Sequence, residues 1–170
     1  LADTTPWALA LGCRRRLAAL TPLDGPTSPW VAPRSAVLMA VAVECRGAWL
    51  ARQPLGTACG VDLSACNASL IPRRSAPLEC RLCELAWRAL SDPTEVLKIG
   101  FATNGPWQGE CRLSPITSGV CYGVALWAEF DLGGDSRLST QPSQLGGVPF
   151  GWTQALQLLT APQQLENGGG

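Results

Sequence analysis

Apolar residues along this chain gather in short runs that turn residues separate, which is the pattern of a β-rich protein. The earliest of these runs is almost wholly apolar and predicts a strand buried on both faces. The third ends at Gly133-Gly134-Asp135, so the fourth is expected to fold back on it as a hairpin partner. The predicted strands are residues 36–45, 95–101, 119–132, 136–140 and 152–160.

Two other stretches have apolar residues at helical spacing. Residues 7–20 predict one helix, and residues 78–90 predict a short helix bounded by Pro77 and by Ser91-Asp92-Pro93. Residues 21–33 contain four prolines and are expected to form a rigid connector. The pattern as a whole predicts a mainly β, antiparallel domain with one or two short helical inserts.

Composition narrows the classes of function. The 170 residues include 13 basic and 13 acidic side chains, so no net charge attracts nucleic acid or an anionic membrane. Only 15% of the residues are charged and 46% are hydrophobic, which excludes a disordered tail and indicates a surface partly covered by other protein. A membrane-spanning helix needs roughly 20 consecutive apolar residues. The uncharged stretches here are interrupted by polar residues, glycine and proline, so no membrane partner is expected.

The chain contains no histidine, which excludes Ser-His-Asp and Cys-His catalysis and any His-ligated metal within it. The glycine pairs Gly133-Gly134 and Gly146-Gly147 do not fit a phosphate-binding motif and predict turns. These patterns alone therefore indicate a β-rich domain without identifying its chemistry.

Eight cysteines are too few for a disulfide scaffold in a chain of this length, so free, buried thiols in a reducing compartment are expected. Four of them pose an alternative, a four-thiolate zinc site: Cys59, Cys66, Cys80 and Cys83. Six residues separate the first two, a spacing too wide for the second pair of a standard site. On the predicted helix, Cys80 and Cys83 would share an apolar face with Leu85 and Trp87. We therefore expect core cysteines and no metal.

Five segments of the chain resemble segments of the C-terminal β-barrel of the protein arginine methyltransferases, and they occur in the same order as in that family. The strand "GVALWAEFDL" and the hairpin "DSRLST" are similar to that family's "LW.E..L" strand and "S.ST" turn. "GWTQALQLL" is similar to the "W.Q" strand that closes the barrel. The upstream matches are the opening strand and an "LS.P" segment. The five segments are residues 31–45, 90–101, 123–132, 135–140 and 151–159. Trp49 and Gly60-Val61-Asp62 favour the second module of the tandem, monomethylating branch.

The resemblance implies a fragment of a protein arginine N-methyltransferase, an enzyme that transfers methyl from S-adenosylmethionine to arginine in protein substrates. Residues 1–30 would be a helix and connector from a missing Rossmann-like cofactor domain, residues 31–162 the barrel, and residues 163–170 a flexible tail. The family's Gly-rich cofactor motif and paired-glutamate loop are not found in this sequence. Catalytic, cofactor-binding and metal-binding residues are therefore not expected here, and S-adenosylmethionine would bind the parent protein rather than this chain.

The same resemblance implies one substrate-binding residue. In the family a Thr-His-Trp loop before the last strand lines the substrate arginine, and the matching residues here are Phe150, Gly151 and Trp152. An indole face suits a flat guanidinium group through cation–π contact. The alternative for Trp152 is a structural plug at the end of the barrel.

Gly151 replaces the family's histidine, which favours a second function, that of a non-catalytic scaffold module supporting an active methyltransferase module. A third possibility is an unrelated secreted β-sandwich tied by disulfides. The expected partners are the upstream Rossmann-like domain and arginine-bearing proteins, without direct nucleic-acid binding. The expected location is cytoplasmic and/or nuclear.

Overall fold

The computed structural model describes residues 32–68, 76–101, 108–146 and 152–167. The predicted helix over residues 7–20, and all but the last two residues of the proline-rich connector, lie outside this range. The described elements in chain order are β1 Ser35–Glu44, α2 Arg46–Leu50, β2 Thr57–Ala58, β3 Val61–Asp62, the 3₁₀ helix η1 Ser64–Cys66, β4 Leu78–Cys80, the 3₁₀ helix η2 Leu82–Glu84, β5 Arg88–Ala89, β6 Thr94–Gly100, β7 Gly119–Gly133, β8 Ser136–Ser139, the 3₁₀ helix η3 Ser143–Leu145, and β9 Gln154–Leu165.

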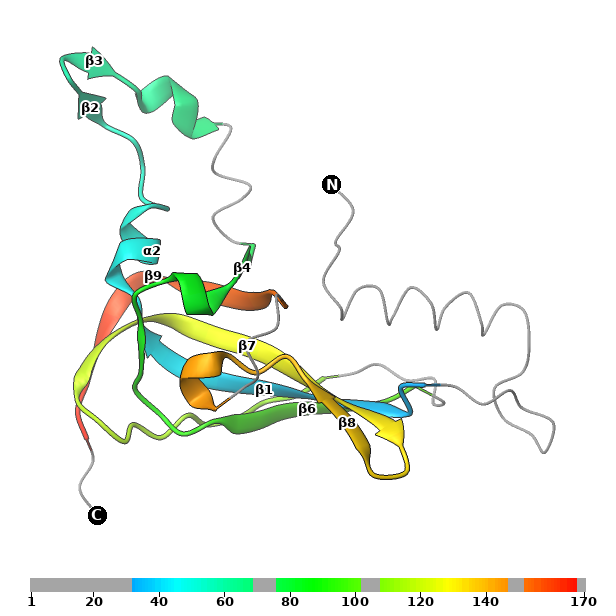
Figure 1. Ribbon diagram of the computed structural model, residues 1–170. Helices are drawn as coiled ribbons and strands as arrows, with labels where there is room; N and C mark the ends of the chain where they lie inside the picture. Colours follow the sequence, from blue (N-terminus) through cyan, green and yellow to red (C-terminus); the bar gives the residue numbers. More distant parts are fainter. Residues whose placement is uncertain (1–31, 69–75, 102–107, 147–151, 168–170) are drawn as a thin grey trace.

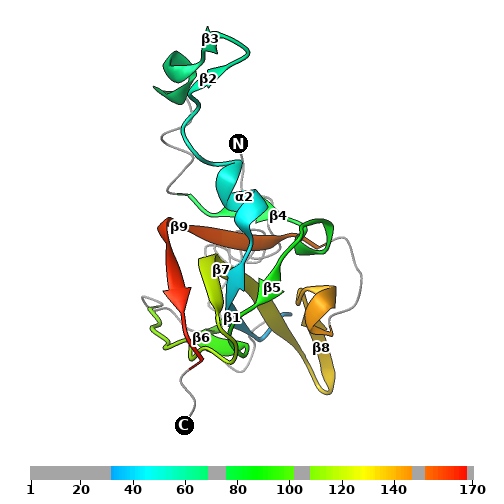
Figure 2. The same ribbon diagram turned by 90° about the vertical axis from the view of Figure 1, so that its left-hand side faces the viewer.

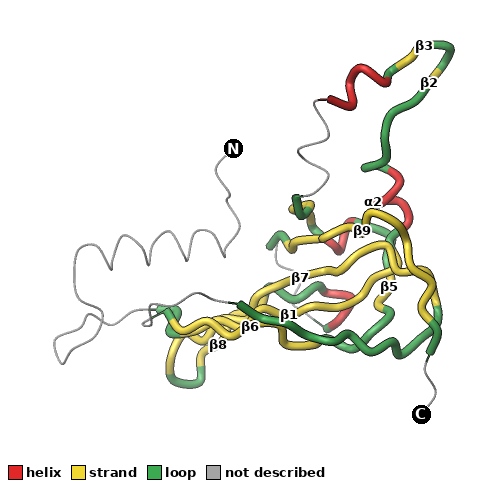
Figure 3. The backbone as a smooth tube through the Cα atoms, turned by 180° about the vertical axis from the view of Figure 1, so that it is seen from behind, coloured by secondary structure: helices red, strands yellow, loops and turns green. Residues whose placement is uncertain are grey.

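The long strand β7 organises the sheet. Residues 35–43 of β1 pair with it along one edge, while on its other edge β9 pairs with the first half of β7 and β8 with the second half. Strand β1 is divided in the same way between β6 and β5. Every pairing between described strands is antiparallel, and the sheet curves into a barrel-like form (Figures 1 and 3). The predicted fold class is confirmed.

Five strands form where the sequence pattern places them, namely β1, β6, β7, β8 and β9. The predicted turn between β7 and β8 also forms. Gly133 and Gly134 have φ values of 94° and 60°, a backbone region that glycine enters without steric cost. The register of β8 against β7 shifts between Asp131 and Gly133, at the start of this turn.

The prediction of a helix over residues 78–90 is wrong. These residues form β4, η2 and β5, and β4 pairs with the beginning of β9, where Cys80 lies opposite Gln154. A helix this short is only marginally stable by itself. Pairing β4 with the edge of β9 satisfies the backbone of both segments, and Leu82 still reaches the core from a 3₁₀ helix. Tertiary pairing thus outweighs the local helical spacing.

Strand β9 bends near its middle (Figure 2). Its register against β7 changes between Cys121, opposite Gln163, and Gly123, opposite Leu158. Residues 159–162 therefore oppose the single residue Tyr122, and they include a proline, which cannot donate a ladder hydrogen bond. Beyond the bend β9 continues to Leu165, so residues 163–165, which were predicted to belong to a flexible tail, are part of this strand.

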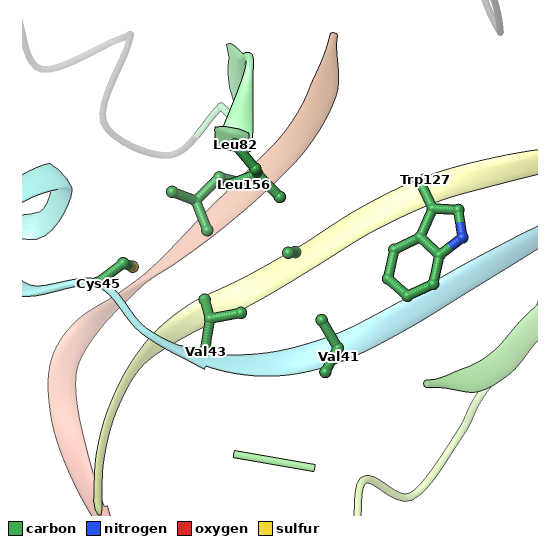
Figure 4. Packing of buried hydrophobic residues seen from close by; sticks show 7 residues of the cluster. Val41, Val43, Cys45, Leu82, Trp127 and Leu156 are labelled. Atoms are coloured by element: carbon green, nitrogen blue, oxygen red, sulfur yellow. The ribbon is translucent and has the colours of Figure 1, made fainter. Parts of the chain in front are cut away.

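The core occupies both faces of the central strands. The largest cluster lies between the curved sheet and the η2 segment, with Cys45 and Trp127 at opposite ends (Figure 4). Its buried members are Val41, Val43, Cys45, Leu82, Ala125, Trp127 and Leu156. Ala36 and Phe130 belong to a second cluster, and Ala42 and Cys121 to a third. Strand β1 contributes to all three, so the prediction that it is buried on both faces is confirmed.

An arm extends from the barrel after α2 and carries the β2–β3 hairpin (Figure 1). The hairpin turn is Cys59-Gly60, with φ values of 50° and 79°, and residues 54–62 are all exposed. The arm is closed by Asn67, whose side-chain amide bonds both the N–H and the carbonyl of Leu55 at 2.8 Å. None of the helices in the described segments is long and apolar enough to cross a membrane.

Candidate functional site

Trp152 lies two residues before the start of β9, at the end of that strand where β4 pairs with it and η2 bonds to it. Its side chain is half-buried. Its backbone carbonyl accepts a hydrogen bond of 3.1 Å from the side-chain amide of Gln154, the first residue of β9. Phe150 and Gly151, the other two positions of the predicted loop, lie outside the described residues.

Gln154 is a buried polar residue with 6% of its surface exposed. Its Oε1 accepts a hydrogen bond from the backbone N–H of Leu82 at 3.0 Å. Its Nε2 donates to the carbonyls of Thr140 at 2.9 Å and of Trp152 at 3.1 Å. Both amide donors are thus used, as a buried amide requires. Gln154 thereby ties together the segments that follow β8, open η2 and precede β9.

Thr140, which follows β8, extends the contact between the hairpin and β7. Its hydroxyl lies within hydrogen-bond distance of both backbone polar atoms of Ala128, at 3.0 Å from the nitrogen and 3.2 Å from the oxygen. Its own backbone N–H donates to the Ala128 carbonyl at 2.9 Å. Only 3% of Thr140 is exposed. The Thr140 carbonyl, which accepts a hydrogen bond from Gln154, therefore belongs to a residue that is itself fixed to β7.

Leu82 anchors the opposite side of this network. Its side chain is fully buried in the main core cluster. Its carbonyl accepts hydrogen bonds from the indole N–H of Trp87 at 3.0 Å and from the amide of Gln144 at 3.3 Å. The η2 segment is therefore attached to the barrel through both backbone polar groups of one residue.

A carboxylate lies beside this segment on the other side of β9. Thr153 donates its hydroxyl proton to Oε1 of Glu79 at 2.9 Å, across the β4–β9 pair. Both side chains are at the surface. Because side chains alternate along a strand, Thr153 and Gln154 point to opposite sides of the sheet. Glu79 is therefore a neighbour of the Trp152 segment without belonging to the buried network.

The indole N–H of Trp127 has no hydrogen-bond partner, although only 3% of this residue is exposed. Trp127 belongs to the same core cluster as Leu82. Its ring occupies the end of the cluster away from Cys45 (Figure 4). Burial of the large ring is thus accompanied by an unsatisfied donor, which costs about 1–3 kcal/mol.

The four cysteines considered as zinc ligands are not brought together. Within the described segments, no group of three or more His, Cys, Asp or Glu side chains is placed to hold a metal ion. Cys59, Cys66 and Cys83 are exposed, so the prediction of buried thiols is wrong for these three. It holds for Cys45 and Cys121, and all seven cysteines in the described residues are free thiols.

Burial alters the acidity of two thiols. Desolvation, with smaller contributions from Cys121 and Cys80, raises the pKa of Cys45 to about 12. Desolvation and the nearby charge of Glu79 raise the pKa of Cys80 to about 11. Both thiols are therefore protonated at neutral pH, and neither is an activated nucleophile.

No family model matches this chain. Its sequence is 37% identical over 135 residues to protein arginine N-methyltransferase 7 of Danio rerio, a match that covers 75% of this chain and 19% of that protein. The proteins of the same name from Xenopus laevis and Mus musculus are 36% and 35% identical, each over 65% of this chain and 17% of their own length. This chain is related to the protein arginine methyltransferases. The predicted resemblance is confirmed, and the unrelated β-sandwich is excluded.

A solved structure has a fold similar to that of the present chain. It is described as the Trypanosoma brucei PRMT1 enzyme-prozyme heterotetrameric complex with AdoHcy. It matches 80% of this chain and 43% of its own chain, with a TM-score of 0.59 and 13% sequence identity. Likeness at this identity shows the fold alone. The present chain spans less than a fifth of the length of the curated relatives it matches.

The described residues do not fit S-adenosylmethionine, the cofactor that the family implies. The helices among them are three to five residues long, and the described strands pair only in antiparallel fashion. Neither arrangement offers the strand–glycine loop–helix junction that places backbone N–H groups around a nucleotide-like ligand. Among the described glycines, Gly123 lies against the backbone of β9 and leaves no space for a ligand.

The sequence patterns did not point to the hydrogen-bond network that reaches the Trp152 carbonyl. Gln154 and Thr140 both occur in the quoted motifs, as the "Q" of "W.Q" and the "T" of "S.ST". The available signal was a polar residue on the apolar side of a strand, since Gln154 alternates in phase with Leu156 and Leu158. The attachment of Leu82 gave no such signal, because it involves backbone groups of a segment predicted as helix.

Proposed function

We propose that this chain is the substrate-side barrel domain of an S-adenosylmethionine-dependent protein arginine methyltransferase, and that Trp152 forms one wall of the arginine site. The homology to protein arginine N-methyltransferase 7 supports the family. The observation that supports the site is the buried Gln154 amide, which fixes the backbone of Trp152 at the end of the barrel. A fixed backbone limits the positions open to the indole, and the orientation of a flat cation requires an aromatic face in a defined place.

The proposed contribution of this chain is orientation. When bound to the parent protein, the cofactor supplies an electrophilic methyl group, and the arginine nitrogen must approach it in line. The indole of Trp152 would restrict the guanidinium plane by cation–π contact and would take no part in proton transfer. Residues that polarise the guanidinium group belong, on this proposal, to the Rossmann-like domain of the same parent chain.

The proposed partners are this Rossmann-like domain and proteins that present arginine, in the cytoplasm and/or the nucleus. Free thiols at all seven described cysteines are typical of such reducing compartments. The low charged fraction of the chain agrees with a barrel that is partly covered by another domain.

A scaffold module is the second candidate, and one feature of the sequence favours it. Gly151 stands where the family has a histidine beside the tryptophan, so the substrate-side loop has lost a polar side chain. In that case the barrel would support an active module, and Trp152 would close the end of the barrel.

The two candidates differ in the effect of Trp152→Ala on the methyltransferase that contains this barrel. If Trp152 lines the arginine site, kcat/KM for an arginine peptide should fall at least about tenfold, equivalent to about 1.4 kcal/mol of transition-state stabilisation. Trp152→Phe should recover part of this loss because it retains an aromatic face. Unchanged activity per mole of folded Trp152→Ala protein would favour the scaffold.

A further inference from the structure

We propose that Gln154 is a positioning residue that sets the place of Trp152, an inference that rests on the proposed function of that tryptophan. Gln154 is two residues from Trp152 and bonds its carbonyl directly. Its other bonds go to Thr140 and Leu82, which are distant in sequence and come from two different parts of the barrel. Where Trp152 sits therefore depends on how these two segments pack.

The hydrogen-bond pattern defines the orientation of the amide. Nε2 faces two carbonyl oxygens, those of Thr140 and Trp152, and Oε1 faces the N–H of Leu82. Rotating the amide by half a turn would place Oε1 against both carbonyls and Nε2 against the N–H. Every one of the three bonds would then be lost. A primary amide in one orientation is thus the group that satisfies this site.

The segments that Gln154 joins are themselves fixed. Thr140 is bonded to Ala128 of β7 through both its side chain and its backbone. The carbonyl of Leu82 is held by Trp87 and Gln144. Because neither end can move easily, loss of the amide should release mainly the third partner, the segment at Trp152, which precedes the strand.

Two substitutions separate positioning from general stability. Gln154→Met has a similar shape and removes all three bonds. Gln154→Glu keeps an acceptor for Leu82, but its carboxylate would face the carbonyls of Thr140 and Trp152. Burial against two carbonyls raises the pKa of a carboxyl group, and the protonated form regains one donor. In the glutamate variant, the position of Trp152 should therefore be altered at high pH and return to that of the unaltered chain as the pH falls.

Other ionisable groups near this position should not imitate that recovery. Cys80, the cross-strand neighbour of Gln154, has its pKa raised to about 11 by burial and stays protonated through the neutral range. Glu79 faces the other side of β9, and Arg81 and Glu84 of the η2 region are exposed and paired with each other. Arg137 of β8 is exposed to solvent. The chain has no histidine.

The test uses the full chain labelled with 5-fluorotryptophan, with the Trp152 fluorine resonance assigned from its loss in Trp152→Phe. Gln154→Met should shift or broaden this resonance. Gln157→Met is the matched control, because Gln157 lies on the same strand and its side chain donates only to the neighbouring carbonyl of Leu158 among the described residues. Its Trp152 resonance should match that of the unaltered chain. For Gln154→Glu, the resonance should return toward the unaltered position between about pH 8 and pH 5.

In the methyltransferase that contains the barrel, Gln154→Met should raise KM for an arginine peptide at least about fivefold while Gln157→Met leaves it unchanged. An unshifted Trp152 resonance in folded Gln154→Met would overturn the inference. If that variant does not fold, a Gln154→Glu resonance that is independent of pH would overturn it instead. If Trp152→Ala proves fully active but the resonance still depends on Gln154, the positioning inference stands and the proposed substrate role of Trp152 fails.

Discussion

Trp49 and Leu159 are joined by a hydrogen bond in which the indole N–H donates to the backbone carbonyl over 2.9 Å. Leu159 is the first of the four residues in the bend of β9, where pairing with β7 is interrupted. The Trp49 ring also contacts Tyr122, the β7 residue opposite the bend, with ring centroids 5.7 Å apart and planes inclined by 53°. The bend therefore holds α2, from which the arm extends.

Trp49→Phe should remove this hydrogen bond and keep the ring contact with Tyr122. We expect the free energy of unfolding to fall by about 1 kcal/mol, the usual value of one such bond. Hydrogen exchange should rise in residues 46–53 and 159–162 and stay constant in β6. If the substitution changes hydrogen exchange equally in all three regions, the bond does not hold the arm.

Gly123→Ala should destabilise the barrel, because an added Cβ would lie 2.6 Å from the carbonyl oxygen of Gln157. Forcing two paired strands apart typically costs about 1–3 kcal/mol. Gly47→Ala is the control, since Gly47 lies in α2 with no atom within 4 Å of the added Cβ. This change should be neutral or stabilise by up to about 1 kcal/mol. Urea unfolding of both variants gives the comparison, and equal stabilities would contradict the close approach of β7 and β9.

Thr140→Val should destabilise the protein by about 1–3 kcal/mol. The valine has nearly the same shape but removes the hydroxyl that bonds Ala128, leaving buried backbone groups less satisfied. Thr140→Ser keeps the hydroxyl and should cost less than Thr140→Val. Thermal unfolding measures both, and the reverse order would mean that the methyl group, rather than the hydroxyl, stabilises this turn.

Stability should decrease at alkaline pH because of two buried thiols. Burial raises the pKa of Cys45 to about 12 and of Cys80 to about 11, whereas unfolded cysteines ionise near pH 8.5. The unfolded chain loses these protons first, so their contribution is complete below about pH 8.5 and is lost as the pH rises toward 11–12. Urea unfolding at about pH 7.5 and pH 10 should show the loss, and Cys45→Ala combined with Cys80→Ala should reduce it. If the double variant loses as much stability at alkaline pH as the unaltered chain, other groups cause that loss.

Alkylation of the native chain should follow exposure. Cys59, Cys66 and Cys83 should react with iodoacetamide under native conditions, and Cys45 and Cys121 only after unfolding. Peptide mapping by mass spectrometry identifies the modified sites. Rapid labelling of Cys45 in the folded protein would contradict its burial in the core.

The chain by itself should not bind S-adenosylmethionine. The segments described by the structure lack a strand–loop–helix junction for a nucleotide-like ligand, and the remaining sequence contains no Gly-rich cofactor motif. Isothermal titration calorimetry should therefore detect no binding at micromolar concentrations. A dissociation constant in the micromolar range or tighter would contradict the assignment to the substrate side.

Several features followed from the sequence alone. The uninterrupted apolar run of β1, the alternation in β6 and β9, and the glycines after β7 each act within a few residues. Period-two burial and left-handed turns are local properties, so five strands and one hairpin were predicted correctly. The ordered motifs also identified the family, and they singled out Trp152 as the residue to test.

Other features depended on residues far apart in the chain. Residues 78–90 have helical spacing, but β4 becomes a strand because the edge of β9 is available to pair with it. Gln154 can join these segments only because the fold brings Thr140 and Leu82 to it from 14 and 72 residues away. Local patterns indicate which side chains prefer burial or a given backbone conformation. They do not indicate which distant backbone groups will pair, because that pairing depends on how the barrel packs.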